Sequence, residues 1–318
     1  MDGKSFPKTH RKFVQQFPDD TACTAYLEQL RWPDGFRCPG CKTQVVPWRQ
    51  TRGRLVCPAC RHQTSVTVDT IFEKTRTPLT TWFDTAWHLT TAKNGFSAKT
   101  AEQVLGISYH TAWAILQRFR VAMVRSERGK LSGLVEVDET LVGGVKQGGK
   151  RGRGTTKSVV VIAVELQEPK GFGRIRMRHI PNASGNSLIS FIGDVVAEHS
   201  TVCTDGWTGY NDLLECKIYK HRKTVLSSSG DPAHVSMPGV HRVASLLKRW
   251  IMGTHQGCIV PEHLQSYLEE FTFRFNRRTS KSRGLVFYRL MEQSIATKPV
   301  TFDDVTFGYD WKNHGRRS

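Results

Sequence analysis

The sequence predicts a mixed α/β domain that follows two smaller N-terminal modules, and three observations support this prediction. Two Cys-x-x-Cys pairs lie within residues 38–60, in a segment of short strand-like runs and turns. Residues 97–124 show helical spacing of apolar side chains on both sides of a Gly-Ile-Ser break. From residue 133 the pattern changes to apolar or alternating runs of strand length, and two amphipathic helical patterns follow after residue 238.

The composition indicates a polyanionic partner. The chain has 318 residues, with 46 Lys+Arg against 28 Asp+Glu and a formal net charge of +18. Nucleic acid is the most common partner of so basic a protein; a basic protein without such a partner and an acidic membrane surface are weaker alternatives. No apolar run approaches the roughly 18 residues of a membrane span, and the first residues lack the apolar segment of a secretory signal.

Four cysteines, Cys38, Cys41, Cys57 and Cys60, have the spacing of a structural zinc site. The two pairs, Cys-Pro-Gly-Cys and Cys-Pro-Ala-Cys, are separated by 15 residues. Four thiolates complete a tetrahedron around the ion, leave no open position for a substrate, and add folding energy that a small β unit lacks. Two redox-active pairs are the alternative, but the surrounding sequence lacks a thioredoxin-like βαβ pattern.

Cations and an aromatic side chain accompany these cysteines. Arg49 and Arg52 follow Trp48 between the two pairs. Such a mixture suits contacts to backbone phosphates of nucleic acid, and a solvated charged face is the alternative interpretation.

The two helical patterns within residues 97–124 have the parts of a helix-turn-helix. The second helix is expected to begin at Ser108 or Tyr109 and to carry Tyr109, His110 and Arg118 on its polar faces. In a DNA complex its first residues would contact base edges and its arginine would contact phosphates. A helical hairpin also occurs as plain structure, but the cysteine motif and the net charge favour DNA binding.

Asp138 and Asp205 are candidate metal ligands. Asp138 lies in an alternating run in which Glu136 shares its face, and Asp205 closes the short strand-like run "TVCTD". Carboxylates at the ends of neighbouring strands hold Mg²⁺, and two ions held in this way can activate an attacking oxygen and stabilise a leaving one. Either aspartate alone fits a solvated strand or turn position, so only the pair supports a catalytic interpretation.

A basic, glycine-rich loop follows the strand of Asp138. Its cations include Lys146, Lys150, Arg151 and Arg153, and residues 143–157 contain no acid. Such a loop suits the binding of substrate phosphates, and a solvated hairpin loop is the alternative.

These motifs together resemble an insertion-sequence transposase of the DDE type, in the ISXO-like group. The resemblance rests on "CPGC…CPAC", "VDETLVGG", "TDGWTGY" and "SLLKRWIMGTHQG…HLQSYLEEFTFRFNRR", and it covers nearly the whole chain. It implies a ribonuclease-H-like mixed sheet flanked by helices. It also implies a Mg²⁺- or Mn²⁺-dependent site that cleaves double-stranded transposon ends and joins the 3′-OH to target DNA. A homodimer or larger assembly, in the cytoplasm of a bacterium and associated with its nucleoid, is expected.

The resemblance also implies roles for single residues. Asp138 and Asp205 match the first two catalytic acids. The third position, where relatives often carry Glu or Asn, holds His241, 36 residues after Asp205 and seven before Lys248. We therefore expect an Asp-Asp-His triad, with His241 either a metal ligand or a general base. Lys248 is expected to hold DNA near the scissile phosphate, with Arg249 beside it.

The expected parts of the chain follow from these patterns. They are an N-terminal helical segment (1–30), a zinc ribbon (31–75), a helix-turn-helix region (76–128), the catalytic α/β domain (129–295) and a C-terminal tail (296–318). A DNA-binding regulator derived from a transposase, with the α/β domain as a scaffold, remains the alternative function. A nickase with a Tyr nucleophile and a His-x-His metal site is excluded, because no two histidines lie two residues apart.

Overall fold

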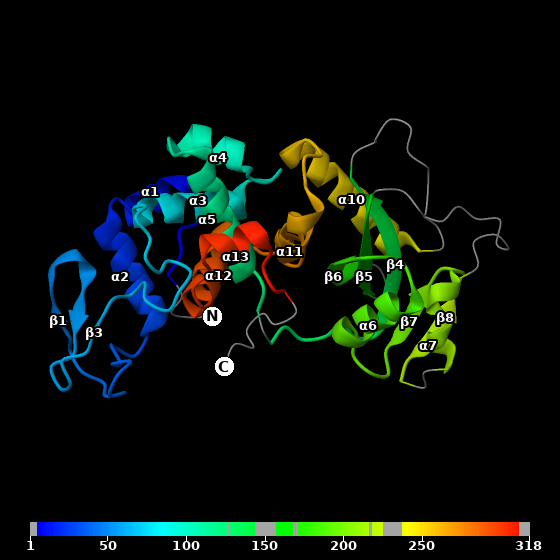
Figure 1. Cartoon of the computed structure of the whole chain (residues 1–318), viewed down its shortest axis with the longest axis horizontal. Coiled ribbons are helices and arrows are strands. Elements are labelled where there is room, and N and C mark those ends of the chain that lie inside the picture. The colour runs from blue at the N-terminus through cyan, green and yellow to red at the C-terminus, as the bar shows by residue number, and fades with distance from the viewer. Residues whose placement is uncertain are drawn as a thin grey trace. The chain divides into compact units, whose positions relative to one another are not determined.

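The computed structural model describes residues 5–125, 127–143, 157–167, 169, 171–215, 218–224 and 237–311. The chain divides into two compact units, and each is described by itself (Figure 1). The first unit comprises Met1–Ser126 and Thr279–Ser318, and the second comprises Glu127–Arg278. Within the described ranges, no helix is long and apolar enough to cross a lipid bilayer.

The first unit begins with two capped helices, α1 (His10–Gln16) and α2 (Asp20–Arg31). The Thr9 hydroxyl and the Asp19 carboxylate each accept a hydrogen bond from a backbone amide in the first turn of the helix that follows. These caps satisfy amides that would otherwise lack a partner. The expected helical segment at residues 1–30 is therefore a pair of helices.

A small three-stranded antiparallel sheet follows, in the order β1 (Trp48–Arg49), β2 (Leu55–Val56), β3 (Gln63–Thr64). A single 3₁₀ turn, η1 (Thr51–Gly53), joins the first two strands. Two cysteines and only two other side chains form the buried cluster of this ribbon: Phe36, Cys38, Leu55 and Cys57. So small a core needs a further source of stability.

Three helices then build the body of the first unit: α3 (Leu79–Thr91), α4 (Ala98–Leu105) and α5 (Tyr109–Ala122). Gly106 ends α4 with φ of 64°, a left-handed conformation that glycine adopts without strain. The Ser108 side chain caps α5 by accepting from the Thr111 amide. The break expected at Gly-Ile-Ser is therefore a helix C-cap followed directly by a helix N-cap.

Helices α12 (Arg283–Ala296) and α13 (Phe302–Phe307) complete the first unit from the C-terminal part of the chain. Phe287 of α12 is fully buried, and its ring centroid lies 5.6 Å from that of Phe13 and 5.9 Å from that of Trp87. The catalytic domain expected from the sequence ran to residue 295, whereas the second unit ends at Arg278. This aromatic packing is the reason for the difference.

The second unit contains a five-stranded mixed sheet in the order β6-β5-β4-β7-β8. Its strands are β4 (Leu134–Val142), β5 (Ser158–Leu166), β6 (Phe172–Ile180), β7 (Thr201–Thr204) and β8 (Lys220–Lys223). Strands β4, β5 and β6 pair antiparallel, and β7 and β8 continue the sheet parallel to β4. The expected ribonuclease-H-like mixed sheet is confirmed.

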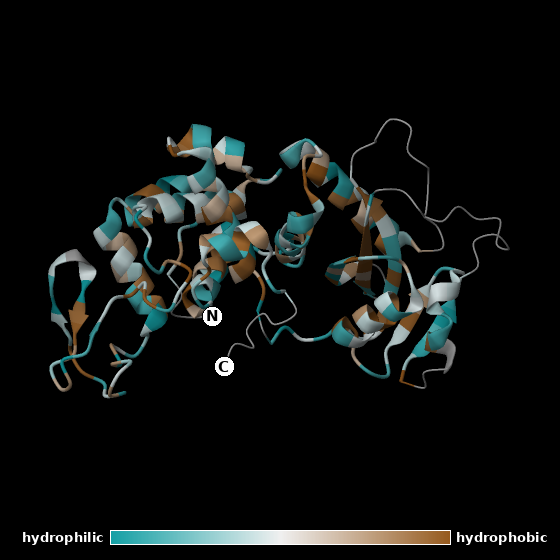
Figure 2. Cartoon of the chain, viewed as in Figure 1, coloured by the Kyte–Doolittle hydropathy of each residue, from teal (hydrophilic) through white to brown (hydrophobic). Residues whose placement is uncertain are grey.

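Helices cover both faces of this sheet. On one face α6 (Gly185–Val195) packs through Leu188, Phe191 and Ile192 against Val135 and Val137 of β4. On the other face lie α10 (Pro238–His255) and α11 (Pro261–Phe275), whose apolar side chains pack against β5 and β6. Helix α10 alternates between hydrophobic and hydrophilic colouring in Figure 2, as an amphipathic helix does.

Two features of the second unit do not follow from the sequence pattern. Strand β8 reads Lys-His-Arg-Lys and lies at the sheet edge, where charged side chains are common because they discourage further pairing. The short elements η2 (Thr208–Tyr210) and α7 (Asp212–Glu215) fill the connection between β7 and β8. The strand order thus contains one more parallel strand than the hydrophobic runs predict.

Candidate functional site

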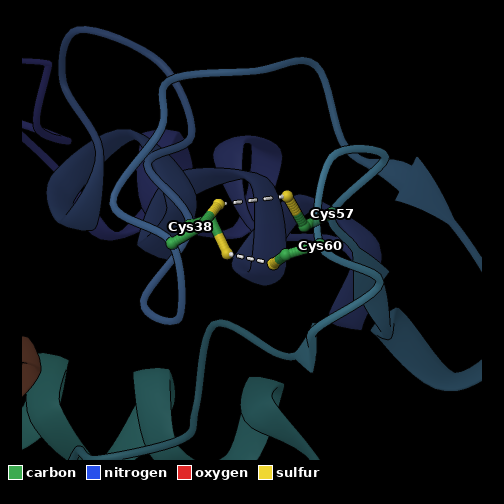
Figure 3. Close-up of side chains that lie close together, drawn as sticks. Cys38, Cys57 and Cys60 are labelled. Atoms are coloured by element: carbon green, nitrogen blue, oxygen red, sulfur yellow. Dashed lines mark hydrogen bonds between the residues drawn. The ribbon is translucent and has the colours of Figure 1, made fainter.

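The four expected zinc ligands lie together in the ribbon. The Sγ atoms of Cys38 and Cys60 are 3.6 Å apart, those of Cys41 and Cys57 are 3.7 Å apart, and the four sulfurs lie within 4.8 Å of one another (Figure 3). A tetrahedron with Zn–S bonds of about 2.3 Å has sulfur–sulfur edges of about 3.8 Å. The sulfur positions therefore fit a four-coordinate zinc ion.

The two cysteine pairs sit on equivalent turns. Lys42 and Arg61, the residues after each pair, have φ of 64° and 63°. The Lys42 amide donates to the Cys38 carbonyl and the Arg61 amide to the Cys57 carbonyl, each at 2.9 Å. Hydrogen bonds from Thr43 lower the pKa of Cys41 to about 6, whereas the hydrogen bond from His62 that lowers the pKa of Cys60 is outweighed by desolvation and the neighbouring thiols, which raise that pKa to about 11. The repeated turn presents each pair of sulfurs to one centre, as a structural site requires.

The expected phosphate contacts of the ribbon have different surroundings. Arg49 donates two hydrogen bonds to the Glu28 carboxylate of α2, at 3.0 and 2.7 Å, so its guanidinium is already engaged. Arg61 stacks over the ring of Trp48, which is 48% exposed, with 4.5 Å from guanidinium carbon to ring centroid. The side chain of Arg52 lies outside the described part of the chain. An exposed Arg–Trp pair is the surface feature that the ribbon offers to a polyanion.

The candidate DNA-contacting residues of α5 divide into two groups. Tyr109 is 44% exposed and His110 is also exposed, both in the first turn. Arg118 is half-buried and its Nε donates to the Val300 carbonyl at 2.8 Å. Burial lowers the pKa of Arg118, while Asp304 raises it. Only the first turn of α5 therefore presents its expected residues to solvent.

The two candidate aspartates lie on β4 and directly after the parallel neighbouring strand β7. The β4/β7 register pairs Leu134 with Thr201 and Glu136 with Cys203. Asp138 is two residues after Glu136, and Asp205 is two residues after Cys203, so both aspartates follow the last register pair by the same number of residues. The Trp207 amide donates to Asp205 at 3.0 Å and fixes the turn that follows β7.

A third carboxylate and a buried phenol lie next to this pair. Tyr210 is fully buried, and its hydroxyl donates to the Glu139 carboxylate at 3.1 Å. Burial raises the pKa of Tyr210, and the negative charges of Glu139, Asp138 and Asp205 raise it further. All three carboxylates therefore contribute to the raised pKa of Tyr210.

Helix α10 brings the remaining expected residues to the same face of the sheet as Asp138. Val243 and Leu247 of α10 pack against Ile162 of β5, the register partner of Asp138. Partial desolvation lowers the pKa of the surface residue Lys248, Lys157 lowers it further, and Asp138 raises it. Lys248 therefore lies within electrostatic reach of Asp138. His241 is half-buried, one residue beyond Val240 at the start of the helix.

Among the described residues, the four ribbon cysteines are the one set of three or more His, Cys, Asp or Glu side chains that lie close enough together to hold a metal ion. Asp138, Asp205 and His241 do not converge as such a group in this structure. Lys146, Lys150, Arg151 and Arg153 of the basic loop lie outside the described residues. Arg249 is exposed on α10, next to Lys248.

Two parts of the chain match known protein families. Residues 130–276 match the ISXO2-like transposase domain, and residues 18–63 match the transposase zinc-ribbon domain. The chain therefore contains an ISXO2-like transposase domain and a transposase zinc ribbon. The resemblance noted in the sequence is thereby confirmed, and the transposase domain coincides with the unit that carries Asp138 and Asp205.

The chain is also similar to two named proteins and one solved structure. A protein of the transposable element ISH50 from Halobacterium salinarum is 27% identical over 280 residues, covering 82% of this chain and 92% of the relative. A transposase-like protein from Haemophilus influenzae is 27% identical over 116 residues, covering 36% of this chain and 92% of the relative. The catalytic core domain of BIV integrase aligns at 15% identity with a TM-score of 0.29, covering 44% of this chain and 81% of that one.

One residue of the transposase domain has a role that the sequence did not reveal. Glu136 is 3% exposed, and its carboxylate accepts a hydrogen bond from the Val240 amide of α10 at 2.9 Å. Burial raises its pKa, whereas the amides of Val240 and Gly239 lower it. An acid at a core position of a strand was visible in the sequence, but its partner on a helix about a hundred residues later was not.

Proposed function

We propose that this transposase binds transposon ends, cleaves the DNA strands, and joins the freed 3′-OH to target DNA by metal-dependent transesterification. The observation that supports the proposal is the β4/β7 register, whose last pair, Glu136 and Cys203, is followed two residues later by Asp138 on one strand and by Asp205 after the other. A carboxylate on one strand and a second at the end of the neighbouring strand form an oxygen-rich donor set that suits Mg²⁺ or Mn²⁺. Such ions would assist attack at phosphorus and stabilise the leaving oxygen.

His241 completes the proposed triad. In this proposal Asp138, Asp205 and His241 would hold the divalent metal that activates the attacking oxygen. His241 lies at the start of α10, whose apolar side packs against the neighbour of β4. Carboxylates and imidazole are ligand types that divalent ions accept, and imidazole suits Mn²⁺ and other borderline ions better than Mg²⁺.

Lys248 has a separate role in the proposal. Desolvation and the charge of Lys157 lower the pKa of Lys248, and the charge of Asp138 raises it. Positive charge beside the carboxylates holds the DNA backbone where the acids act, because phosphates bind cations in a salt-dependent manner. Arg249 extends this positive surface along α10.

The first unit is proposed to bind double-stranded transposon ends. Tyr109 and His110 are exposed at the start of α5, where a recognition helix contacts base edges. The Trp48–Arg61 pair supplies an aromatic surface and a cation for the sugar-phosphate backbone. Because two ends must be brought together for joining, we propose a homodimer or larger assembly on DNA.

A cleavage and joining assay on the flanking end duplex, in Mg²⁺ and in Mn²⁺, tests the proposal. Asp138→Ala and His241→Ala should each abolish turnover and leave end binding unchanged. Asp194→Ala is the matched control, because Asp194 is an exposed acid of α6 that pairs with Arg178 away from these residues. End binding without any cleavage by wild-type protein would instead support a DNA-binding regulator, and normal cleavage by Asp138→Ala would remove Asp138 from the site. Near-normal turnover by His241→Ala alone would remove His241 from the triad.

A further inference from the structure

The N-terminus of α10 is held by a carboxylate from another element. Met237 precedes the helix and offers no capping side chain, and Pro238 at its first position has no amide hydrogen. The next two amides, of Gly239 and Val240, both point to Glu136 on β4. A buried carboxylate at a helix N-terminus satisfies free amides and interacts favourably with the helix dipole.

The contact is close because residue 239 is glycine. A Cβ atom at this position would lie 2.8 Å from the Glu136 carboxylate oxygen and 3.0 Å from Leu166 Cδ2. Either distance is shorter than a normal contact, so a larger residue would force the Glu136 carboxylate, the Leu166 side chain or the start of the helix to shift. Gly239 therefore permits the approach that Glu136 uses.

This contact lies between two proposed metal ligands. Glu136 is two residues before Asp138 on the same face of β4, and Val240 directly precedes His241 on α10. One side chain thus connects the strand that carries the first ligand to the helix turn that carries the third.

We propose that Glu136 is a positioning residue that fixes the start of α10 against β4 and so sets His241 relative to Asp138. The inference rests on the proposed function, because it takes Asp138 and His241 as ligands. Glu136 itself touches neither DNA nor metal; it acts through the backbone of α10. Its loss should therefore weaken metal binding more than it slows turnover at saturating metal.

Glu136→Gln tests this in the full-length, zinc-loaded protein. The amide keeps the shape of the side chain but can accept at only one oxygen, and its NH₂ group opposes a second backbone donor. Mn²⁺ binding, followed by the electron paramagnetic resonance signal of free Mn²⁺, should weaken by about tenfold, the lower end of the range for groups that orient ligands. The Mn²⁺ concentration for half-maximal cleavage should rise equally, with kcat at saturating Mn²⁺ within about threefold of wild type.

Glu165→Gln is the matched control. Glu165, on the adjacent strand β5, also accepts hydrogen bonds from backbone amides, of Ser132 and Arg174, but none from α10. The Glu165→Gln substitution should lower the thermal stability of the protein without changing its Mn²⁺ affinity. Gly239→Ala keeps the carboxylate, displaces the helix, and should weaken Mn²⁺ binding as Glu136→Gln does, which covers the case in which Glu136→Gln does not fold.

Unchanged Mn²⁺ affinity in Glu136→Gln or, if that variant does not fold, in Gly239→Ala would overturn the proposal and leave Glu136 as a plain helix cap. Asp138→Ala separates this failure from failure of the proposed function. If Asp138→Ala binds Mn²⁺ and cleaves like wild type, the metal site itself is misplaced, whatever Glu136→Gln does.

Discussion

Phe287→Ala tests whether the C-terminal helix α12 completes the proposed end-binding unit. Phe287 is 0% exposed, and five aromatic rings surround it, with centroids between 5.6 and 6.3 Å away. Replacing a buried phenylalanine with alanine costs about 3–5 kcal/mol, and so many ring neighbours cannot all close the cavity. We expect about 4 kcal/mol, which leaves a typical domain folded but easily opened.

Hydrogen exchange read peptide by peptide measures this cost in each unit. A loss of about 4 kcal/mol lowers amide protection by roughly three orders of magnitude where exchange requires opening of the unit. Protection should fall in α3 and α12 and stay unchanged in β4 and β5. End binding should weaken, and Mn²⁺ binding should not. Phe191→Ala, a fully buried phenylalanine of α6, should give the opposite pattern. Loss of protection in β4 and β5 on Phe287→Ala would refute this assignment of α12.

Three further predictions follow from the sites. Cys57→Ser, or removal of zinc by a strong chelator, should unfold the ribbon and abolish end binding while sparing Mn²⁺ binding. The reason is that the buried cluster of the ribbon contains only two side chains besides the zinc ligands. Zinc content and circular dichroism measure the loss of the ribbon. His241→Glu should shift the preference of cleavage from Mn²⁺ toward Mg²⁺, and equal metal profiles for both proteins would count against an imidazole ligand. Burial raises the pKa of Glu165, but hydrogen bonds from Arg174 and Ser132 and the charge of Arg174 outweigh it and lower the pKa. Its stabilisation should therefore be complete above about pH 5 and fade as pH falls through the lowered pKa. The urea-unfolding free energies of wild type and Glu165→Gln should thus converge as the pH falls below the lowered pKa, and a constant difference would contradict the assignment.

The zinc site could be predicted from sequence because all four ligands lie within a short segment of the chain. The spacing of Cys38, Cys41, Cys57 and Cys60 alone restricts the ligand geometry, and the structure adds only the repeated turns. The mixed sheet was predictable from runs of apolar residues, but β8 was not, because an edge strand of four basic residues carries no hydrophobic signal.

Long-range contacts limited the prediction of the candidate site. The alternating pattern of β4 predicts that Glu136 and Asp138 share one face of the sheet. It does not predict which strands lie beside β4, because the strand order is not encoded in any local pattern. The ion pair of Arg49 with Glu28 and the hydrogen bond of Arg118 to Val300 are likewise partnerships across the fold. Sequence spacing identified the charged residues, and only the tertiary structure distinguishes those already engaged from those facing solvent.

Asp205, which follows Cys203 of the β4/β7 register as Asp138 follows Glu136, is proposed to take part in DNA cleavage through its charge. Asp205→Asn tests this proposal directly, because the amide oxygen can still accept the hydrogen bond from the Trp207 amide and preserve the turn. End binding and strand cleavage are measured in the same samples, with Asp194→Asn as the control acid. The account predicts normal end binding with cleavage and joining abolished in Asp205→Asn alone. Wild-type cleavage by Asp205→Asn would contradict it.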